Sequence, residues 1–232
     1  MGKRSKRFKK ASESINRDQV YAIDQAVEIL KSNASAKFDE TVDLAAHLGV
    51  DAKQAEQNLR GTISLPHGTG KKVRVVVFAE GENAQAALDA GADEVGVDDL
   101  VDKIAGGWME FDATVSTPDL MRRITPKLGR ILGPRGLMPN AKTGTVTNDV
   151  ASVVNNIKAG QIEYRVERES GIVHVPVGKA SFGKEQIEDN IQAVMGTLMR
   201  VRPSTLKGRY LKSVSISSTM GAGIRVDLQS LV

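Results

Sequence analysis

The strongest constraint on the fold is a change of hydrophobic pattern along the chain. Residues 73–79, VRVVVFA, form an almost unbroken apolar run, which is typical of a strand covered on both faces. Strand-like and helix-like segments then alternate as far as Lys158. This alternation predicts a parallel sheet with helices on both sides, and therefore a three-layer α/β unit in the middle of the chain.

The two flanks have a different pattern. Apolar and polar residues alternate over 41–48, which predicts a half-buried strand. A hairpin is expected over 161–177, and helices over 18–31 and 184–201. Neither flank is large enough to bury a good core alone, so we expect the two to fold together.

The predicted fold class is therefore α/β, with two domains. Both chain ends, residues 1–67 plus 160–232, form a split α+β two-layer domain. Residues 68–159 form an inserted three-layer Rossmann-like α/β domain.

Charge and composition narrow the class of partner. The net charge is +4, and residues 1–10 carry six Lys or Arg and no acidic residue. Clustered cations suit a polyanion such as nucleic acid, although a charged tail can also serve only to keep a chain in solution. The chain has no cysteine, which excludes a disulfide framework and a thiol nucleophile. No apolar run approaches the roughly 20 residues of a membrane helix, and no secretory signal is expected, so we predict a cytoplasmic protein.

Enzyme motifs are incomplete. HGTGKK at 67–72 resembles part of a phosphate loop, but Lys72 leads into a strand rather than a helix. The turn at 79–83 has one glycine and flanking acids, which disfavours a dinucleotide pyrophosphate. The three histidines are far apart, and the acidic residues of 93–102 lack calcium-loop spacing. We expect no catalytic residues, metal site or cofactor; a small-molecule-binding α/β enzyme is the alternative.

The most unusual stretch is ITPKLGRILGPRGLMPNAKTGTV at 124–146. It combines four glycines and three prolines with four cations, which predicts an irregular loop. It is either a structured cap on the α/β unit or a phosphate-binding surface, and the residues alone leave both possibilities open.

KLGRILGPRGLMP (127–139) also resembles the signature of the bacterial large-subunit ribosomal protein one family, the protein of the mobile stalk beside the tRNA exit site. Further segments are similar to that family, in the same order: KFDETVDL (37–44), QNLRGTISLPHGTGK (57–71), VGKASF (177–182) and SSTMGAG (217–223). The resemblance covers essentially the whole chain. Its departures, Pro126, Ala141 and RRIT at 122–125, are small.

The resemblance implies a function as well as a fold. Members of the family are structural constituents of the large ribosomal subunit and not enzymes. They bind 23S-type rRNA through the split domain, form the mobile exit-site stalk and assist release of deacylated tRNA. They also repress translation of their own operon by binding its mRNA. The partners expected are large-subunit rRNA, exit-site tRNA and own-operon mRNA, with no membrane, and a monomer off the ribosome.

The resemblance also places RNA contacts in two distant segments. The first holds Lys37, Phe38 and Thr41; the second holds Ser217, Thr219, Met220 and Gly221. His174 and Lys179, on or just after the hairpin strand, are added to this set. Cations, hydroxyls and flat apolar groups suit RNA, which is read through phosphates, 2′-hydroxyls and shape. Phe38 has an alternative place in the core, because it continues the apolar face of Val42 and Leu44.

Overall fold

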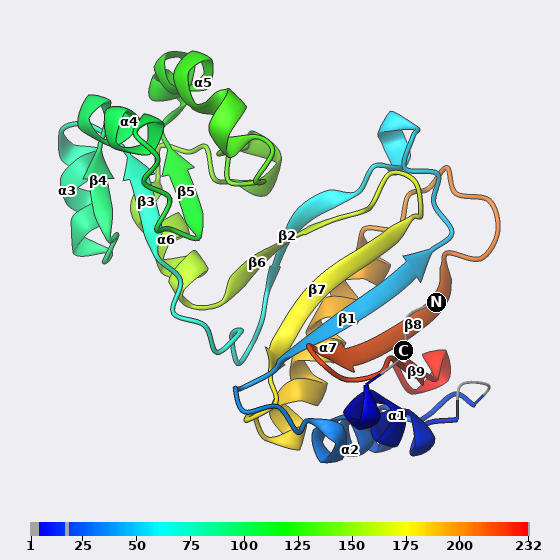
Figure 1. Cartoon of the computed structure of the whole chain (residues 1–232). Coiled ribbons are helices and arrows are strands. Elements are labelled where there is room, and N and C mark those ends of the chain that lie inside the picture. Colours follow the sequence, from blue (N-terminus) through cyan, green and yellow to red (C-terminus); the bar gives the residue numbers. More distant parts are fainter. Residues whose placement is uncertain (1–4, 17–18, 232) are drawn as a thin grey trace. The chain divides into compact units, whose positions relative to one another are not determined.

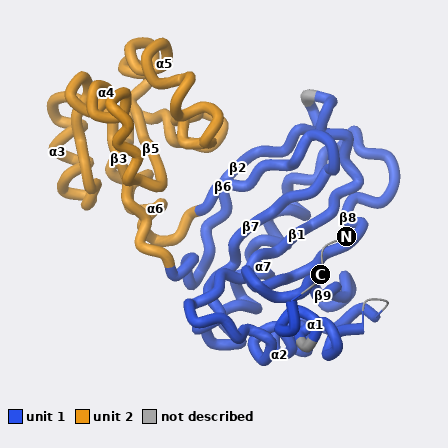
Figure 2. Tube along the Cα trace, in the orientation of Figure 1, with its two compact units in different colours: residues 1–70, 162–232 blue, residues 71–161 orange. Residues whose placement is uncertain are grey.

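The computed structural model describes residues 5–16 and 19–231, and the chain divides into two compact units (Figure 2). One unit comprises residues 1–70 and 162–232, and the other residues 71–161. Residues 1–4 of the basic N-terminal segment lie outside the described residues. The mixed α/β architecture confirms the predicted fold class.

The first unit is built on a four-stranded antiparallel sheet in the order β7-β1-β8-β9 (Figure 1). Its elements are α1 (Lys6–Glu13), α2 (Ile23–Asn33), β1 (Thr41–Leu48), η1 (Ala55–Gln57), β2 (Arg60–Ser64), β6 (Gln161–Arg165), β7 (Ile172–Lys179), α7 (Lys184–Arg200), β8 (Leu211–Ser218), β9 (Ile224–Val226) and η3 (Leu228–Leu231).

The alternation of β1 gives this unit its two layers. Val42, Leu44, Ala46 and Leu48 are completely buried, whereas the residues between them are partly exposed. Helix α7 buries Ile187, Ile191, Val194, Met195 and Leu198 in the same core. Helices α2 and α7 pack together, with α7 against β7 and α2 against β8 and β9. The other face of the sheet therefore carries the residues of β1, β7 and β8 that point away from the core.

The predicted hairpin is only partly correct. The chain does turn between Glu167 and Ile172, and Val166 bridges Val173. However, β6 pairs with β2, and β7 pairs with β1 in the other sheet. The hairpin is limited to this bridge because each of its two strands finds a separate partner from the N-terminal flank.

The second unit has a parallel sheet in the order β4-β3-β5. Its elements are β3 (Val75–Phe78), α3 (Glu82–Asp89), β4 (Glu94–Gly96), α4 (Asp98–Ala105), β5 (Ala113–Ser116), α5 (Pro118–Leu132), η2 (Ala141–Thr143) and α6 (Val150–Lys158). All four residues of β3 are buried, two in each of two apolar clusters. Helices α4 and α5 supply the first cluster and α3 and α6 the second, which gives three layers.

The expectation of an irregular loop over 124–146 is wrong for residues 124–132, which are helical. Helix α5 continues to Leu132 through Pro126, whose ring removes one helical hydrogen bond. Leu120, Ile124, Leu128 and Leu132 repeat every four residues and are buried. Burial of this apolar stripe outweighs the cost of the proline and of Gly129.

Among the described residues, none of the helices has the length and apolar character needed to cross a membrane.

Candidate nucleic-acid interface

The two segments named from the sequence meet at one end of the four-stranded sheet. Antiparallel pairing places Val42 opposite Ser218, so the start of β1 adjoins the turn after β8. The backbone N–H of Thr41 donates to Oγ1 of Thr219 at 2.9 Å, and the N–H of Thr219 donates to the carbonyl of Thr41 at 3.0 Å. Residues 37–41 and 217–221 therefore form one continuous surface.

Two apolar side chains stand exposed on this surface. Phe38 is 55% exposed and Met220 is 46% exposed. The alternative place of Phe38 in the core is therefore wrong. The other large exposed apolar side chains of the described residues, Val20, Leu88 and Met199, lie outside the two segments. Exposed apolar groups that gather on a surface mark a contact site more often than scattered ones do.

A third segment joins the surface from the end of β7. Thr41 pairs with Lys179, and Nζ of Lys179 donates to Oγ1 of Thr41 at 2.8 Å. Ser181, two residues further on, donates from its N–H and its hydroxyl to the carboxylate of Asp39, at 3.1 and 2.7 Å. Lys37 is exposed, and no carboxylate in the described part of the chain is within ion-pair distance of it.

His174 lies further along the sheet. It is exposed on β7 opposite Ala45, four positions along β1 from Thr41. Ser217 lies between these positions, paired with Asp43. Burial raises the pKa of the Asp43 carboxyl, and the nearby His174 and Lys179 oppose that rise. The structure thus brings Lys179, but not His174, to the two loops.

Glu40 is the residue of this region that the sequence reasoning missed. It is in phase with the buried residues of β1, and only 2% of it is exposed. Burial alone would raise the pKa of its carboxyl, but hydrogen bonds from Ser218, Met220 and Ala36 hold that pKa below its ordinary value. The sequence did contain a signal for it, because a charged residue at a position that the alternating pattern predicts to be buried is unusual.

Gly221 has a steric explanation. A Cβ atom on it would lie 2.5 Å from Oγ of Ser218, which is too close for any real contact. Its backbone is not in the left-handed region. A side chain at this position would therefore have to displace the Ser218 hydroxyl from its hydrogen bond to Glu40.

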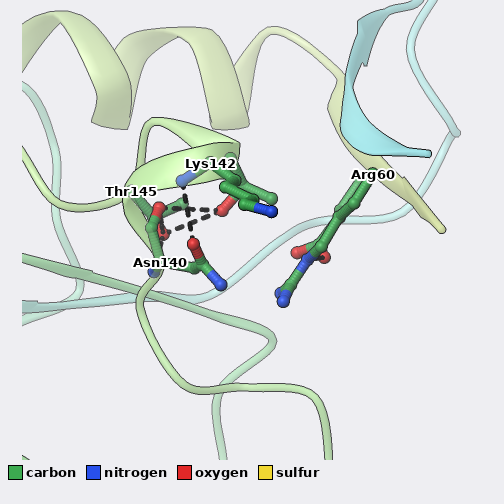
Figure 3. A network of polar contacts seen from close by, with 6 residues as sticks. Arg60, Asn140, Lys142 and Thr145 are labelled. Atoms are coloured by element: carbon green, nitrogen blue, oxygen red, sulfur yellow. Dashed lines mark hydrogen bonds and ion pairs between the residues drawn. The ribbon is translucent and has the colours of Figure 1, made fainter. Parts of the chain in front are cut away.

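The rest of the glycine-rich segment is an ordered cap on the second unit. Leu137 and Met138 pack on its core, and Thr114 donates a hydrogen bond to the carbonyl of Leu137. Figure 3 shows Asn140, whose side chain accepts from the N–H of Lys142 at 2.8 Å. Arg60, which is also labelled in Figure 3, is not part of this cap: it belongs to the first unit, where its Nε donates to Glu163 at 2.5 Å. The possibility of a structured cap is thus correct, and it does not exclude a phosphate-binding role for the exposed cations.

Within the described residues, no group of three or more His, Asp or Glu side chains is arranged to hold a metal ion. The surface offers hydroxyl groups, the exposed Lys37 and two exposed apolar side chains, which are groups suited to binding a partner molecule. Comparison with known proteins agrees with this class.

Residues 30–222 match the family described as Ribosomal protein L1p/L10e family. The protein named "Large ribosomal subunit protein uL1" from Cutibacterium acnes (strain DSM 16379 / KPA171202) is 54% identical over 225 residues, covering 97% of this chain and 96% of the relative. The protein of the same name from Nocardioides sp. (strain ATCC BAA-499 / JS614) is 54% identical over 224 residues, covering 97% and 92%. The chain belongs to the ribosomal protein L1p/L10e family, which confirms the resemblance. Because this is a family of structural ribosomal proteins, the prediction of a non-enzyme is also confirmed and the enzyme alternative is set aside.

Proposed function

We propose that this protein is a constituent of the large ribosomal subunit, working on cytoplasmic ribosomes, and that it binds rRNA through the surface at the end of β1. One observation carries the location of the contact: residues 37–41 and 217–221 are joined by reciprocal hydrogen bonds between Thr41 and Thr219. Phe38 and Met220, in the two segments that this junction joins, are both exposed to solvent. The split domain, 1–67 plus 160–232, is accordingly the proposed RNA-binding domain.

Each side chain has a role that suits folded RNA. Lys37 meets a phosphate, and Phe38 and Met220 cover a ribose or an exposed base. The hydroxyl of Ser217 bonds to a 2′-hydroxyl, whereas those of Thr41 and Thr219 also hold the protein together. Gly221 lies beside Met220 in the turn, and Lys179 adds charge at the edge. His174 extends the proposed contact along the sheet.

The nearby carboxylates make this surface different from a plain basic patch. Asp39 is bonded to Ser181, Glu40 is buried and Asp43 is half-buried. We therefore expect the surface to bind RNA mainly through complementary shape, hydroxyl groups and apolar contact, and less through neutralisation of phosphate charge. Such a surface selects a folded RNA structure over RNA in general.

Three finer roles extend this proposal. The protein forms the mobile exit-site stalk with its rRNA, and there it contacts exit-site tRNA and assists release of the deacylated tRNA. It also represses translation of its own operon, because a surface that reads shape binds an mRNA folded like the rRNA site. The division into two compact units supports the first role, because one unit can bind rRNA while the other is left available for a different contact. Off the ribosome the protein is proposed to be a monomer.

Sedimentation and competition test the proposal. Labelled protein added to an extract should travel with large subunits through a sucrose gradient and leave them only at high salt. Its own mRNA leader should compete with an rRNA fragment for one site, with full displacement at saturation. Protein that stays at the top of the gradient at low salt would contradict ribosomal binding. Simultaneous binding of both RNAs would contradict the shared surface.

A further inference from the structure

Glu40 is a buried carboxylate that accepts hydrogen bonds from a hydroxyl and two backbone N–H groups, while the charge of Arg7 makes only a lesser contribution to its lowered pKa. Its Oε2 accepts from the hydroxyl of Ser218 at 2.7 Å and from the N–H of Met220 at 3.0 Å. Its Oε1 accepts from the N–H of Ala36 at 3.0 Å. A carboxylate that is almost fully buried is costly unless hydrogen bonds satisfy it, so its retention here requires a reason.

The two oxygens of Glu40 reach different parts of the proposed interface. Oε1 holds the chain just before Lys37 and Phe38, and Oε2 holds the turn that carries Met220. The backbone carbonyl of Glu40 also accepts from the N–H of Ala180 at 2.8 Å, next to Lys179. One residue therefore contacts all three segments of the surface, while its own carboxylate is withdrawn from solvent.

We propose that Glu40 is the positioning residue of the RNA-binding surface: its carboxylate fixes the Phe38 and Met220 loops in the binding arrangement before RNA arrives, without touching RNA. The inference rests on the proposed function. Loops that are ordered during folding do not lose that freedom on binding, and affinity rises accordingly. Removing the carboxylate leaves two backbone N–H groups and one hydroxyl without their acceptor, so both loops loosen together.

A double-mutant cycle distinguishes positioning from a general loss of stability. Binding of an rRNA fragment is measured for wild type, Glu40→Ala, Met220→Ala and the double variant, well below each melting temperature. Because Glu40 acts partly through Met220, its removal should weaken binding about tenfold in the wild-type background and clearly less in the Met220→Ala background. Equal losses in both backgrounds would overturn the positioning role through Met220.

Hydrogen exchange and a Glu40→Gln variant provide two further tests of the positioning role. In the free protein, hydrogen exchange at the amides of Ala36 and Met220 should accelerate in Glu40→Ala, while the amides of α7 stay protected. Glu40→Gln, which keeps one acceptor oxygen, should bind between wild type and Glu40→Ala, and it replaces the alanine variant if that fails to fold. Unchanged exchange at both loop amides would contradict the proposal.

A matched control is Gln57→Ala. Gln57 is also buried and accepts a backbone hydrogen bond, from Asp51 at 2.8 Å, but it follows the opposite end of β1. Its loss should lower stability and leave RNA affinity within twofold. If Glu40→Ala binds like wild type while Met220→Ala binds weakly, only the positioning role fails. If Met220→Ala also binds normally, the proposed RNA surface itself is wrong.

Discussion

Thr41 and Thr219 are 178 residues apart in sequence and share three hydrogen bonds. The Thr219 hydroxyl accepts from the N–H of Thr41 at 2.9 Å and lies 3.2 Å from the carbonyl of Thr41, to which it donates. The third bond runs from the N–H of Thr219 to the same carbonyl. The proposed contact surface therefore exists only when both chain ends fold together.

Thr219→Ala removes the hydroxyl that takes part in two of these bonds. Because the site is exposed and water can replace part of the loss, stability should fall by only about 0.5 to 1.5 kcal/mol. Binding of the rRNA fragment, measured by filter binding, should fall several-fold or more. Thr219→Ser keeps the hydroxyl and should stay close to wild type. A weak serine variant would show that the methyl group, and not the hydroxyl, makes the contact.

Gly221→Ala should weaken RNA binding by displacing Ser218. The added Cβ would lie 2.5 Å from the Ser218 hydroxyl, which is the group that donates to Glu40. Gly223→Ala is the matched control, because no atom lies within 4 Å of a Cβ there. We expect Gly223→Ala to bind within twofold of wild type and Gly221→Ala at least fivefold more weakly. Equal affinities for the two variants would remove the steric explanation.

Acid should weaken the folded state through Glu40. The folded-state pKa of its carboxyl is below the ordinary value of 4.5, so the unfolded chain binds the proton more readily. The stability contributed by the charge is present above pH 4.5 and is lost as the pH falls through the folded-state pKa. The difference in free energy of unfolding between wild type and Glu40→Gln should therefore shrink below pH 4.5. A difference that stays constant between pH 6 and pH 3 would contradict this.

Asn190 should matter for stability rather than for RNA. It is completely buried, donates to the carbonyls of Gly68 and Val177 and accepts from the N–H of His67. Asn190→Leu leaves these groups unpaired and should cost about 3 kcal/mol in denaturant unfolding. Asn155→Leu, on the exposed face of α6, should change stability by less than about 0.5 kcal/mol. If the two variants lost similar amounts of stability, the hydrogen bonds of Asn190 would not be important for the fold.

The sequence predicted best where hydrophobic period and burial agree. The alternation of β1 and the apolar run of β3 are both confirmed, because in each case the pattern is read directly from local residues. The helix expected over 18–31 begins only at Ile23. Tyr21 instead donates to the carbonyl of Arg225 and accepts from Asp227, which draws it to β9. A contact across some two hundred residues has no local signal.

In the candidate site, too, the sequence predicted some features and missed those that depend on contacts between distant residues. The family resemblance named both segments, and their meeting through Thr41 and Thr219 follows from the split fold. Glu40 was missed because its role depends on Ser218 and Met220, which only the folded chain brings to it.

Replacing Met220 by aspartate tests the central claim most directly. Met199→Asp is the control, since Met199 is also exposed but lies near the end of α7. Covering a methionine side chain is worth about 1.5 to 3 kcal/mol, so Met220→Asp should weaken binding of a large-subunit rRNA fragment by at least tenfold. Met199→Asp should bind like wild type, with both variants folded by circular dichroism. Wild-type affinity in a folded Met220→Asp protein would contradict the assignment of this surface.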